Sequence, residues 1–149
     1  MTIHDKKLFD KFEKIKVKRV KINGLNFYLA KCVYSDFLIE NAIIDKVNDT
    51  LTKNLKGKID LADYKKITKT KKLNGWFETL LFTKLTKTPK GLVIDTNKID
   101  ADLWPTLFLL LEPISEFIKN DSKFIFCDDK ERFWEAEICK GELKYFKYF

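Results

Sequence analysis

The chain has 149 residues, 45% of them hydrophobic and 21 of them aromatic, so it can bury a core without disulfides or metals. The longest uninterrupted apolar run, Leu107–Leu111, is far too short to cross a bilayer, and charged residues break up the N-terminus, which argues against a signal peptide. We therefore expect a single cytoplasmic domain spanning residues 1–149, with no membrane association.

The formal net charge of +7 is unevenly distributed along the chain. Residues 1–34 carry +6 and residues 64–90 carry +7, whereas residues 35–63 carry −2 and residues 91–149 carry −4. Lysine outnumbers arginine by 27 to 2, as an AT-rich genome would produce. Positive charge is therefore concentrated in two segments, and the C-terminal third is acidic.

The N-terminal third predicts two strands. Residues 5–16 have the apolar spacing of a short amphipathic helix, although they could equally run into the first strand. Asn23-Gly24 then separates two β-prone runs, which is the sequence typical of a type I′ hairpin turn. With that turn, Ile22 would face Leu25 and Val20 would face Phe27 across the hairpin.

The next segment predicts the first main helix, over residues 36–56. Ser35 can cap its N-terminus and Gly57 can end it. Its apolar residues fall on one stripe, namely Ile39, Ile43, Ile44, Val47, Leu51 and Leu55. Such a helix should cover one face of a sheet.

Residues 61–87 predict a second hairpin, around Asn74-Gly75. The alternating Lys and Thr residues of 67–72 suit an edge strand with one wet face. Residues 76–86 also fit a helix, but their three threonines favour a strand. A turn at 88–91 and a short strand at 92–95 follow.

The last third predicts a helix followed by a three-stranded meander. Asp100 or Asp102 can cap this helix, Pro105 is tolerated in its first turn, and Pro113 should kink it before it ends near residues 119–120. A turn at Lys140-Gly141 sets the register of the last two strands. The predicted pairs are Ile138 with Leu143, Glu137 with Lys144, Ala136 with Tyr145, and Trp134 with Lys147. In this register Glu135, Glu137 and Lys144 face away from the core.

Together these elements predict an α+β fold in the order ββ-α-βββ-α-βββ. It would have about eight mostly antiparallel strands and two main helices. The oligomeric state is left open.

Catalytic and cofactor signatures are absent from the sequence. His4 is the only histidine, which argues against Ser–His or Cys–His catalysis, and the three cysteines lack metal-ligand spacing. We therefore expect no cofactor. An enzyme could still use the carboxylates between Asp128 and Glu137, where Asp128, Asp129 and Glu131 share one loop. Acidic hairpin loops are, however, commonly just solvated.

The basic segments indicate a nucleic-acid-binding module as one alternative. Arg19 lies in the first predicted hairpin, and Lys66, Lys69, Lys71 and Lys72 lie in the second. Neighbouring hairpins would form a positive sheet edge that could bind a phosphate backbone. The competing interpretation is a solvated edge that resists aggregation.

A binding protein for another protein is the function we expect first, because the chain has no catalytic set, polarised charge and many aromatic residues. Its ending, an apolar helix followed by KFIFCDDKERFWEAEICKGELKYF, resembles the tails of small bacterial toxin-immunity proteins from polymorphic-toxin loci. The resemblance covers about 48 residues, is a pattern of elements, and carries over no functional residue. It implies a cognate toxin as partner. The positive net charge departs from immunity proteins against nuclease toxins, which are usually acidic.

Overall fold

The computed structural model describes residues 5–15, 18–24, 26–27 and 29–149, and their fold is α+β. The larger sheet has five antiparallel strands, in the spatial order β1 (Arg19–Lys21), β8 (Glu142–Tyr148), β7 (Phe133–Cys139), β6 (Lys123–Cys127) and β2 (Lys31–Ser35). The smaller antiparallel sheet has the order β3 (Leu38–Glu40), β5 (Gly91–Val93) and β4 (Thr86–Lys87).

The described residues also form five α-helices, which are α1 (Lys6–Lys14), α2 (Ile44–Asn54), α3 (Leu61–Thr70), α4 (Asn74–Leu81) and α5 (Trp104–Leu111). Short 3-10 segments are η1 (Asn41–Ile43), η2 (Thr96–Lys98), η3 (Ala101–Leu103) and η4 (Glu112–Phe117). The α+β class and the antiparallel strands are confirmed, whereas the predicted order and the number of main helices are not.

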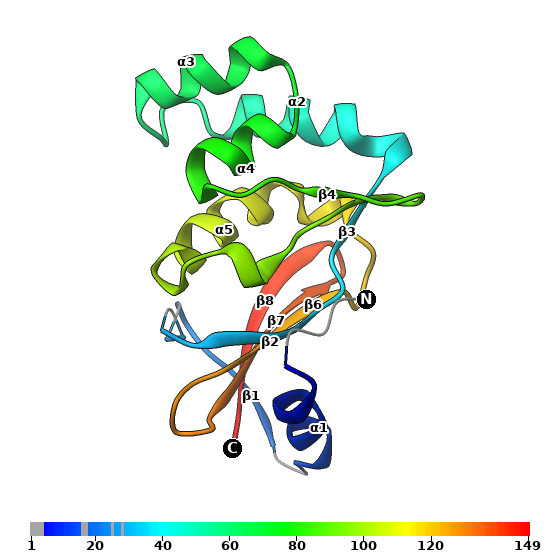
Figure 1. Cartoon of the computed structure of the whole chain (residues 1–149), viewed down its shortest axis with the longest axis vertical. Helices are drawn as coiled ribbons and strands as arrows, with labels where there is room; N and C mark the ends of the chain where they lie inside the picture. The colour runs from blue at the N-terminus through cyan, green and yellow to red at the C-terminus, as the bar shows by residue number, and fades with distance from the viewer. Residues whose placement is uncertain (1–4, 16–17, 25, 28) are drawn as a thin grey trace.

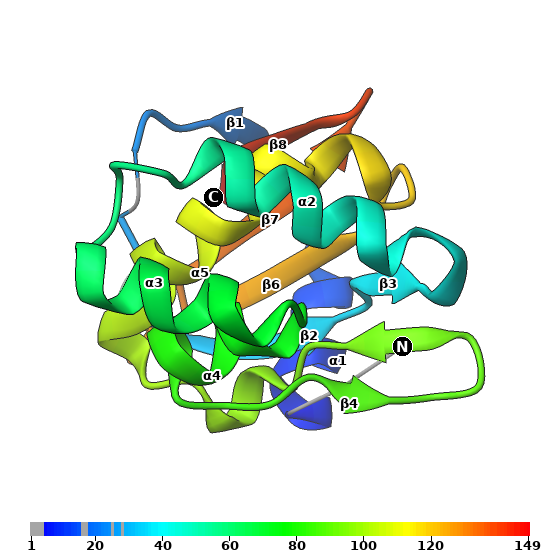
Figure 2. The same ribbon diagram turned by 90° about the horizontal axis from the view of Figure 1, so that it is seen from above.

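The larger sheet separates two cores of different size. α5 lies against one face, and α2, α3 and α4 form a further layer beyond it (Figures 1 and 2). The large core fills these layers and contains Trp76, Phe108, Phe126 and Trp134. On the opposite face, α1 covers a small aromatic core. There Phe12 packs edge-on to the Tyr148 ring at 4.8 Å.

The C-terminal meander has the predicted register. Ile138 pairs with Leu143, Glu137 with Lys144, Ala136 with Tyr145, and Trp134 with Lys147. The helix before it follows the prediction at its two prolines, but neither Asp100 nor Asp102 caps α5, whose N-cap is Leu103 without a side-chain hydrogen bond. Pro105 lies in the first turn of α5, and the chain changes from α-helix to 3-10 helix at Glu112-Pro113, where proline removes a helical hydrogen bond.

The predicted hairpin around Asn23-Gly24 is wrong. β1 pairs with β8 and β2 pairs with β6, so the two strands lie at opposite edges of the larger sheet. The reason is Phe27, which is fully buried and stacks on the Phe126 ring with centroids 4.7 Å apart. The segment after the turn thus enters the core instead of pairing back. Leu25, the predicted partner of Ile22, lies outside the described residues.

The predicted hairpin around Asn74-Gly75 is also wrong, because its two arms are the helices α3 and α4. Asp60 caps α3 by accepting a hydrogen bond from the Asp63 N–H at 3.1 Å, a cap that the sequence interpretation overlooked. Gly75 is buried between the helices, where a Cβ would lie 2.7 Å from the Thr70 hydroxyl. This glycine therefore permits a close helix contact and does not form a β-turn.

The predicted helix over 36–56 begins later than expected. Residues 38–40 form β3, and the helix α2 starts only at Ile44. Its apolar stripe is confirmed at Val47, Leu51 and Leu55, which are completely buried. The residues between β2 and α2 instead cross from one sheet to the other, and this crossing creates the site described next.

Candidate partner-binding cleft

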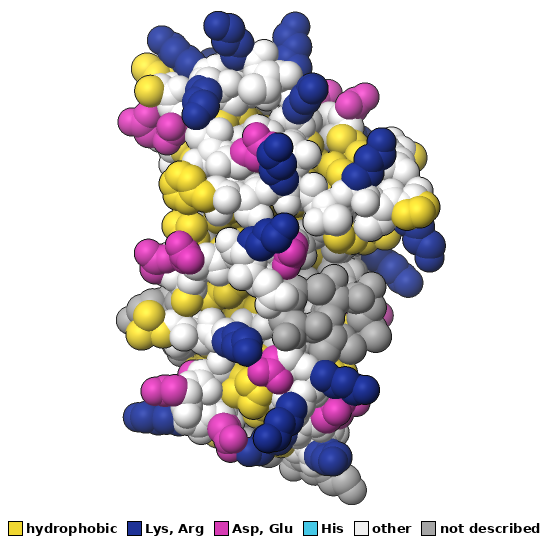
Figure 3. Space-filling view, viewed as in Figure 1, with side chains coloured by type: hydrophobic (Ala, Val, Ile, Leu, Met, Phe, Trp, Pro, Cys, Tyr) yellow, Lys and Arg dark blue, Asp and Glu magenta, His cyan; other side chains and the backbone are white. Residues whose placement is uncertain are grey.

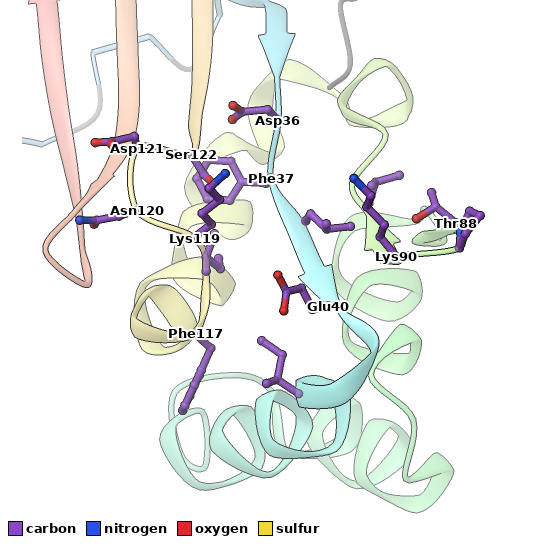
Figure 4. Close-up of a pocket in the computed structure, with 15 residues that line it drawn as sticks. Asp36, Phe37, Glu40, Thr88, Lys90, Phe117, Lys119, Asn120, Asp121 and Ser122 are labelled. Atoms are coloured by element: carbon purple, nitrogen blue, oxygen red, sulfur yellow. The ribbon is translucent and has the colours of Figure 1, made fainter.

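A cleft opens where β2 and β6 separate. Their ladder ends at Asp36, whose N–H donates to the Lys123 carbonyl at 3.2 Å and whose Oδ1 accepts from the Lys123 N–H at 2.7 Å. From there the chain continues into β3, which pairs with β5, whereas the segment 117–122 approaches β7. The Ile138 N–H donates to the Ser122 carbonyl at 2.9 Å. The segment that leads from Asp36 into β3 and the segment 117–122 therefore diverge, and they leave a cleft of about 910 Å³ between them (Figure 4).

The floor of the cleft is apolar and firmly held. Its apolar lining comes from five segments and comprises Phe37, Leu38, Ile43, Pro89, Val93, Phe117 and Ile118. The Phe37 ring stacks on Phe124, with centroids 4.0 Å apart and planes 10° from parallel. The volume lies within the range of about 300–1,000 Å³ that is usual for ligand pockets. The cleft is thus large enough for a short peptide segment.

The strand β3 presents an unpaired edge to this cleft. The Asn41 N–H donates to the Lys90 carbonyl at 3.1 Å, and Ile39 lies opposite Leu92. Since hydrogen-bonding direction alternates along an antiparallel strand, the N–H and C=O groups of Leu38 and the N–H of Glu40 point away from β5, whereas Glu40 is the N-cap of η1 and its carbonyl accepts the first hydrogen bond of that helix. β3 is a terminal strand of its sheet among the described strands, and its free side faces the segment 117–122 (Figure 4).

Both signs of charge border the cleft. Glu40 and Lys90 are exposed on the β3–β5 side, and Lys119 and Asp121 are exposed on the opposite side. Within the described part of the chain, none of these four side chains takes part in an ion pair. They are therefore available to a charged partner.

Arg19 does not lie on a free basic surface as predicted. Its Nη2 atom lies 2.9 Å from Glu135 Oε2 and 2.9 Å from Glu137 Oε1, and its guanidinium stacks over the Phe146 ring at 3.5 Å. The arginine therefore contacts both glutamates on this face of the sheet. It is not available for a nucleic acid in the way that the sequence interpretation requires.

The four lysines of the predicted basic hairpin lie elsewhere than expected. Lys66 and Lys69 are on α3, and Lys71 and Lys72 follow it, so no hairpin carries them. All four are exposed. None lines the cleft.

The three acidic loop residues between β6 and β7 make local contacts. Asp128 accepts hydrogen bonds from the Arg132 N–H at 2.8 Å and from Arg132 Nε at 2.6 Å. Glu131 pairs with Lys11 of α1. Asp129 is exposed. Asp128 thus shapes the loop and Glu131 helps to hold α1 in place.

The carboxylates of Glu135 and Glu137 form the most perturbed group of titratable side chains. Glu135 is 1% exposed, and burial, together with the hydrogen bond and charge of Glu137, raises its pKa to about 7. Burial alone would also raise the pKa of Glu137, but hydrogen bonds from Arg19 and Cys139 hold it below its usual value. Both glutamates were expected on the wet face of the sheet. That face is instead covered by Arg19 and by Tyr148, whose hydroxyl donates to Glu135 Oε1 at 3.1 Å.

This pair does not build an evident reaction centre. Neither glutamate lines the cleft, and among the described residues no three His, Cys, Asp or Glu side chains come together as a metal-binding group. Burial of Glu135 and the contacts of Arg19 with both carboxylates account for the arrangement.

Sequence reasoning missed the cleft entirely, because Asp36 and Phe37 were assigned to a helix. The signal that could have revealed it is the run CVYSDFLIE, in which two short β-prone stretches flank an aspartate. Aspartate is disfavoured in strands and can accept backbone hydrogen bonds through its side chain. Such a run is compatible with two strands that belong to different sheets.

Comparisons with known proteins assign no relative. No helix in the described part of the chain is long and apolar enough to cross a membrane. No protein-family model matches the chain, and no match is found among curated proteins or among solved structures.

Proposed function

We propose that this protein is a non-enzymatic cytoplasmic protein that binds another protein, and that an extended segment of the partner occupies the cleft beside β3. The observation that carries the proposal is the unpaired edge of β3 above an apolar floor. An added strand would pair with the main-chain groups of Leu38 and with the N–H of Glu40, and its side chains would reach the apolar lining.

The unpaired groups explain why a peptide is favoured over a small molecule. A strand edge offers main-chain donors and acceptors in a regular row, which only another extended backbone can match throughout. Natural proteins usually protect such edges by short length or by charge. β3 has both, with three residues and an exposed Glu40, so it is a short recognition edge and not an aggregation site.

A toxin-neutralising immunity protein is one form of this function, in line with the resemblance of the C-terminal third. The cleft then holds a segment of the cognate toxin. Finding a gene for a large secreted toxin directly upstream would support the immunity function. If no such gene lies there, the broader proposal of partner binding is still tested at the cleft.

The backbone at Glu40 permits a sharp test. Its φ of −64° matches the angle that proline imposes, and its N–H points away from β5, so Glu40→Pro should leave the sheet intact. The same substitution removes the N–H that the proposal assigns to the partner. Glu40→Gln is the matched control, because it removes the charge and keeps the N–H.

The experiment selects binders from a displayed library of random peptides against the wild-type protein. We expect the selected peptides to lose about tenfold in affinity for Glu40→Pro, since a lost backbone hydrogen bond costs about 1–1.5 kcal/mol, and to lose little for Glu40→Gln. Hydrogen exchange should show protection of the Leu38 and Glu40 amides on binding. Peptides that bind Glu40→Pro as tightly as the wild type would refute the proposal.

A further inference from the structure

The positive charge of the protein belongs to one part of the fold. Residues 41–90, which run from η1 through α2, α3 and α4 to the turn between β4 and β5, carry twelve lysines and five acidic residues, a net of +7. The rest of the chain carries 17 basic and 17 acidic residues, a net of zero. Figure 3 shows basic side chains gathered at the end of the molecule formed by α2 and α3. The net positive charge of the protein therefore lies in residues 41–90, because basic and acidic residues balance in the rest of the chain.

Eight lysines form the most basic part of this region. They are all exposed, and in the following they are called the lysine surface, comprising Lys53, Lys56, Lys58, Lys65, Lys66, Lys69, Lys71 and Lys72. Within the described residues no member of the lysine surface forms an ion pair. Asp60 and Asp63 are the only acidic residues between Lys53 and Lys72, and Asp60 caps the N-terminus of α3. These cations are therefore not paired with a carboxylate of the described residues.

The helix α3 aligns part of the lysine surface along one ridge. Ile67 is buried, so Lys65 and Lys69, each two residues from it, lie on the opposite, outward side. They are four residues apart, which is about 6 Å along the axis. Lys72 lies beyond the helix, which ends at Thr70 and is followed by Lys71 with a left-handed backbone at φ 54°. Like charges at this spacing destabilise a helix by about 0.2–0.5 kcal/mol per pair. A bound polyanion would remove that repulsion.

The supporting layer holds the lysine surface in place. The Tyr64 hydroxyl donates to the Thr52 carbonyl at 2.8 Å, which joins α3 to α2. Trp76 Nε1 donates to Asn48 Oδ1 at 2.9 Å, which joins α4 to α2. The three helices therefore present the lysines on a rigid scaffold, and little of the scaffold must order on binding.

The composition of the surface favours nucleic acid over a protein or a membrane. Leu61, at the start of α3, is the one large apolar side chain that residues 53–72 expose. Between Lys65 and Lys72 the exposed side chains are lysines and Thr70, and Ile67 is buried. Protein interfaces need apolar or aromatic anchors, and interfacial helices insert apolar side chains into lipid. A phosphate backbone needs only cations, so we propose that the lysine surface binds nucleic acid without reading its sequence.

The test compares two triple variants with equal net charge. The ridge triple, Lys65→Gln, Lys69→Gln and Lys72→Gln, removes both ridge lysines and the exposed Lys72 that follows α3. The control triple Lys6→Gln, Lys7→Gln and Lys14→Gln removes three exposed lysines of α1 that form no ion pair with described residues. Both triples lower the formal net charge from +7 to about +4. Circular dichroism and urea unfolding establish that both variants fold.

Binding to short DNA and RNA duplexes is measured by fluorescence anisotropy from about 50 mM to about 300 mM salt. We expect the ridge triple to lose at least about tenfold in affinity, and the slope of log K against log salt to become less negative by about 2–3, since each phosphate contact contributes about 0.9. The control triple should change affinity by less than about twofold. Peptide binding at the cleft should be unchanged in both, which separates this proposal from the previous one.

Three results would overturn the inference. The first is no binding to either duplex at about 50 mM salt, where electrostatic binding is strong. The second is an equal loss for both triples, which would mean that net charge alone matters. The third is tighter binding to vesicles containing phosphatidylserine than to nucleic acid, which would assign the surface to anionic lipid.

Discussion

The two neighbouring glutamates on β7 should respond to substitution in opposite directions. Glu135 is 1% exposed and has its pKa raised to about 7 from 4.5, chiefly by burial. Between about pH 4.5 and about pH 7, the folded protein therefore holds a proton on Glu135 that the unfolded chain has released. Stability from this group is complete below about pH 4.5 and is lost as the pH rises through about 7.

The size of the effect follows from that shift. A change from 4.5 to about 7 corresponds to about 3 kcal/mol of unfolding free energy, lost between acidic and mildly alkaline pH. Glu135→Gln keeps an acceptor for the Tyr148 hydroxyl and carries no charge, so it removes this loss. We expect it to be about 1–3 kcal/mol more stable than the wild type near pH 8 and about equal near pH 5.

Glu137→Gln provides the contrast. Its carboxylate accepts hydrogen bonds from Arg19 Nη2 at 2.9 Å and from Cys139 Sγ at 3.1 Å, and its pKa is lowered. A lowered pKa contributes stability above the unfolded value, which is lost as the carboxylate protonates in acid. Glu137→Gln should therefore destabilise the protein near pH 8, and by less in acid.

Urea unfolding followed by tryptophan fluorescence between about pH 5 and about pH 8 measures both variants. The reasoning fails if Glu135→Gln is less stable than the wild type at the alkaline end. It also fails if the difference between Glu135→Gln and the wild type does not depend on pH.

Two further substitutions test the backbone around the cleft. Gly91→Ala would place a Cβ 2.1 Å from the Ile39 carbonyl oxygen, so it should separate β3 from β5 and lower the unfolding free energy by about 3 kcal/mol or more. The control Gly57→Ala, at φ +80° with no atom near the added Cβ, should lower it by about 1 kcal/mol. Equal unfolding free energies of the two variants in urea would contradict this. Asp36→Ala leaves the Lys123 N–H without its side-chain acceptor and should lower the unfolding free energy by about 1–2 kcal/mol. Asp36→Asn keeps an oxygen at that place and should lower it by less. The same loss of stability for both variants would contradict the role assigned to Asp36.

The meander could be predicted from the sequence because its signals are local and agree with one another. Glycine at a two-residue turn and alternating apolar residues on both strands leave one register that buries Trp134, Ala136 and Ile138. A one-residue slip would turn these side chains to the opposite face. Local pattern and global fold specify the same structure there.

The two Asn-Gly hairpins could not be excluded in this way, because the decisive contacts are distant in sequence. The segment after Asn23-Gly24 is directed by the stacking of Phe27 on Phe126, across 99 residues of chain. At Asn74-Gly75, the Asn74 side chain accepts from the Leu85 N–H at 2.8 Å, while Gly75 allows α4 to approach α3. A dipeptide that favours a turn was overridden by burial in both cases.

One error of sequence reasoning coincides with the candidate site, and one residue accounts for both. Asp36 was expected inside the first turn of a helix capped by Ser35. In the structure its carboxylate takes the place of a strand backbone by accepting the Lys123 N–H, so the β2–β6 ladder ends with its groups satisfied. The chain is then free to join a second sheet, and the space between the diverging chains is the cleft. A residue that interrupts regular secondary structure, as Asp36 interrupts the β2–β6 ladder, is expected at a functional site, where a particular geometry matters more than regular pairing. The outward main-chain groups of Leu38 and the outward N–H of Glu40 result from this change of sheet, and they are the groups that a partner strand would use.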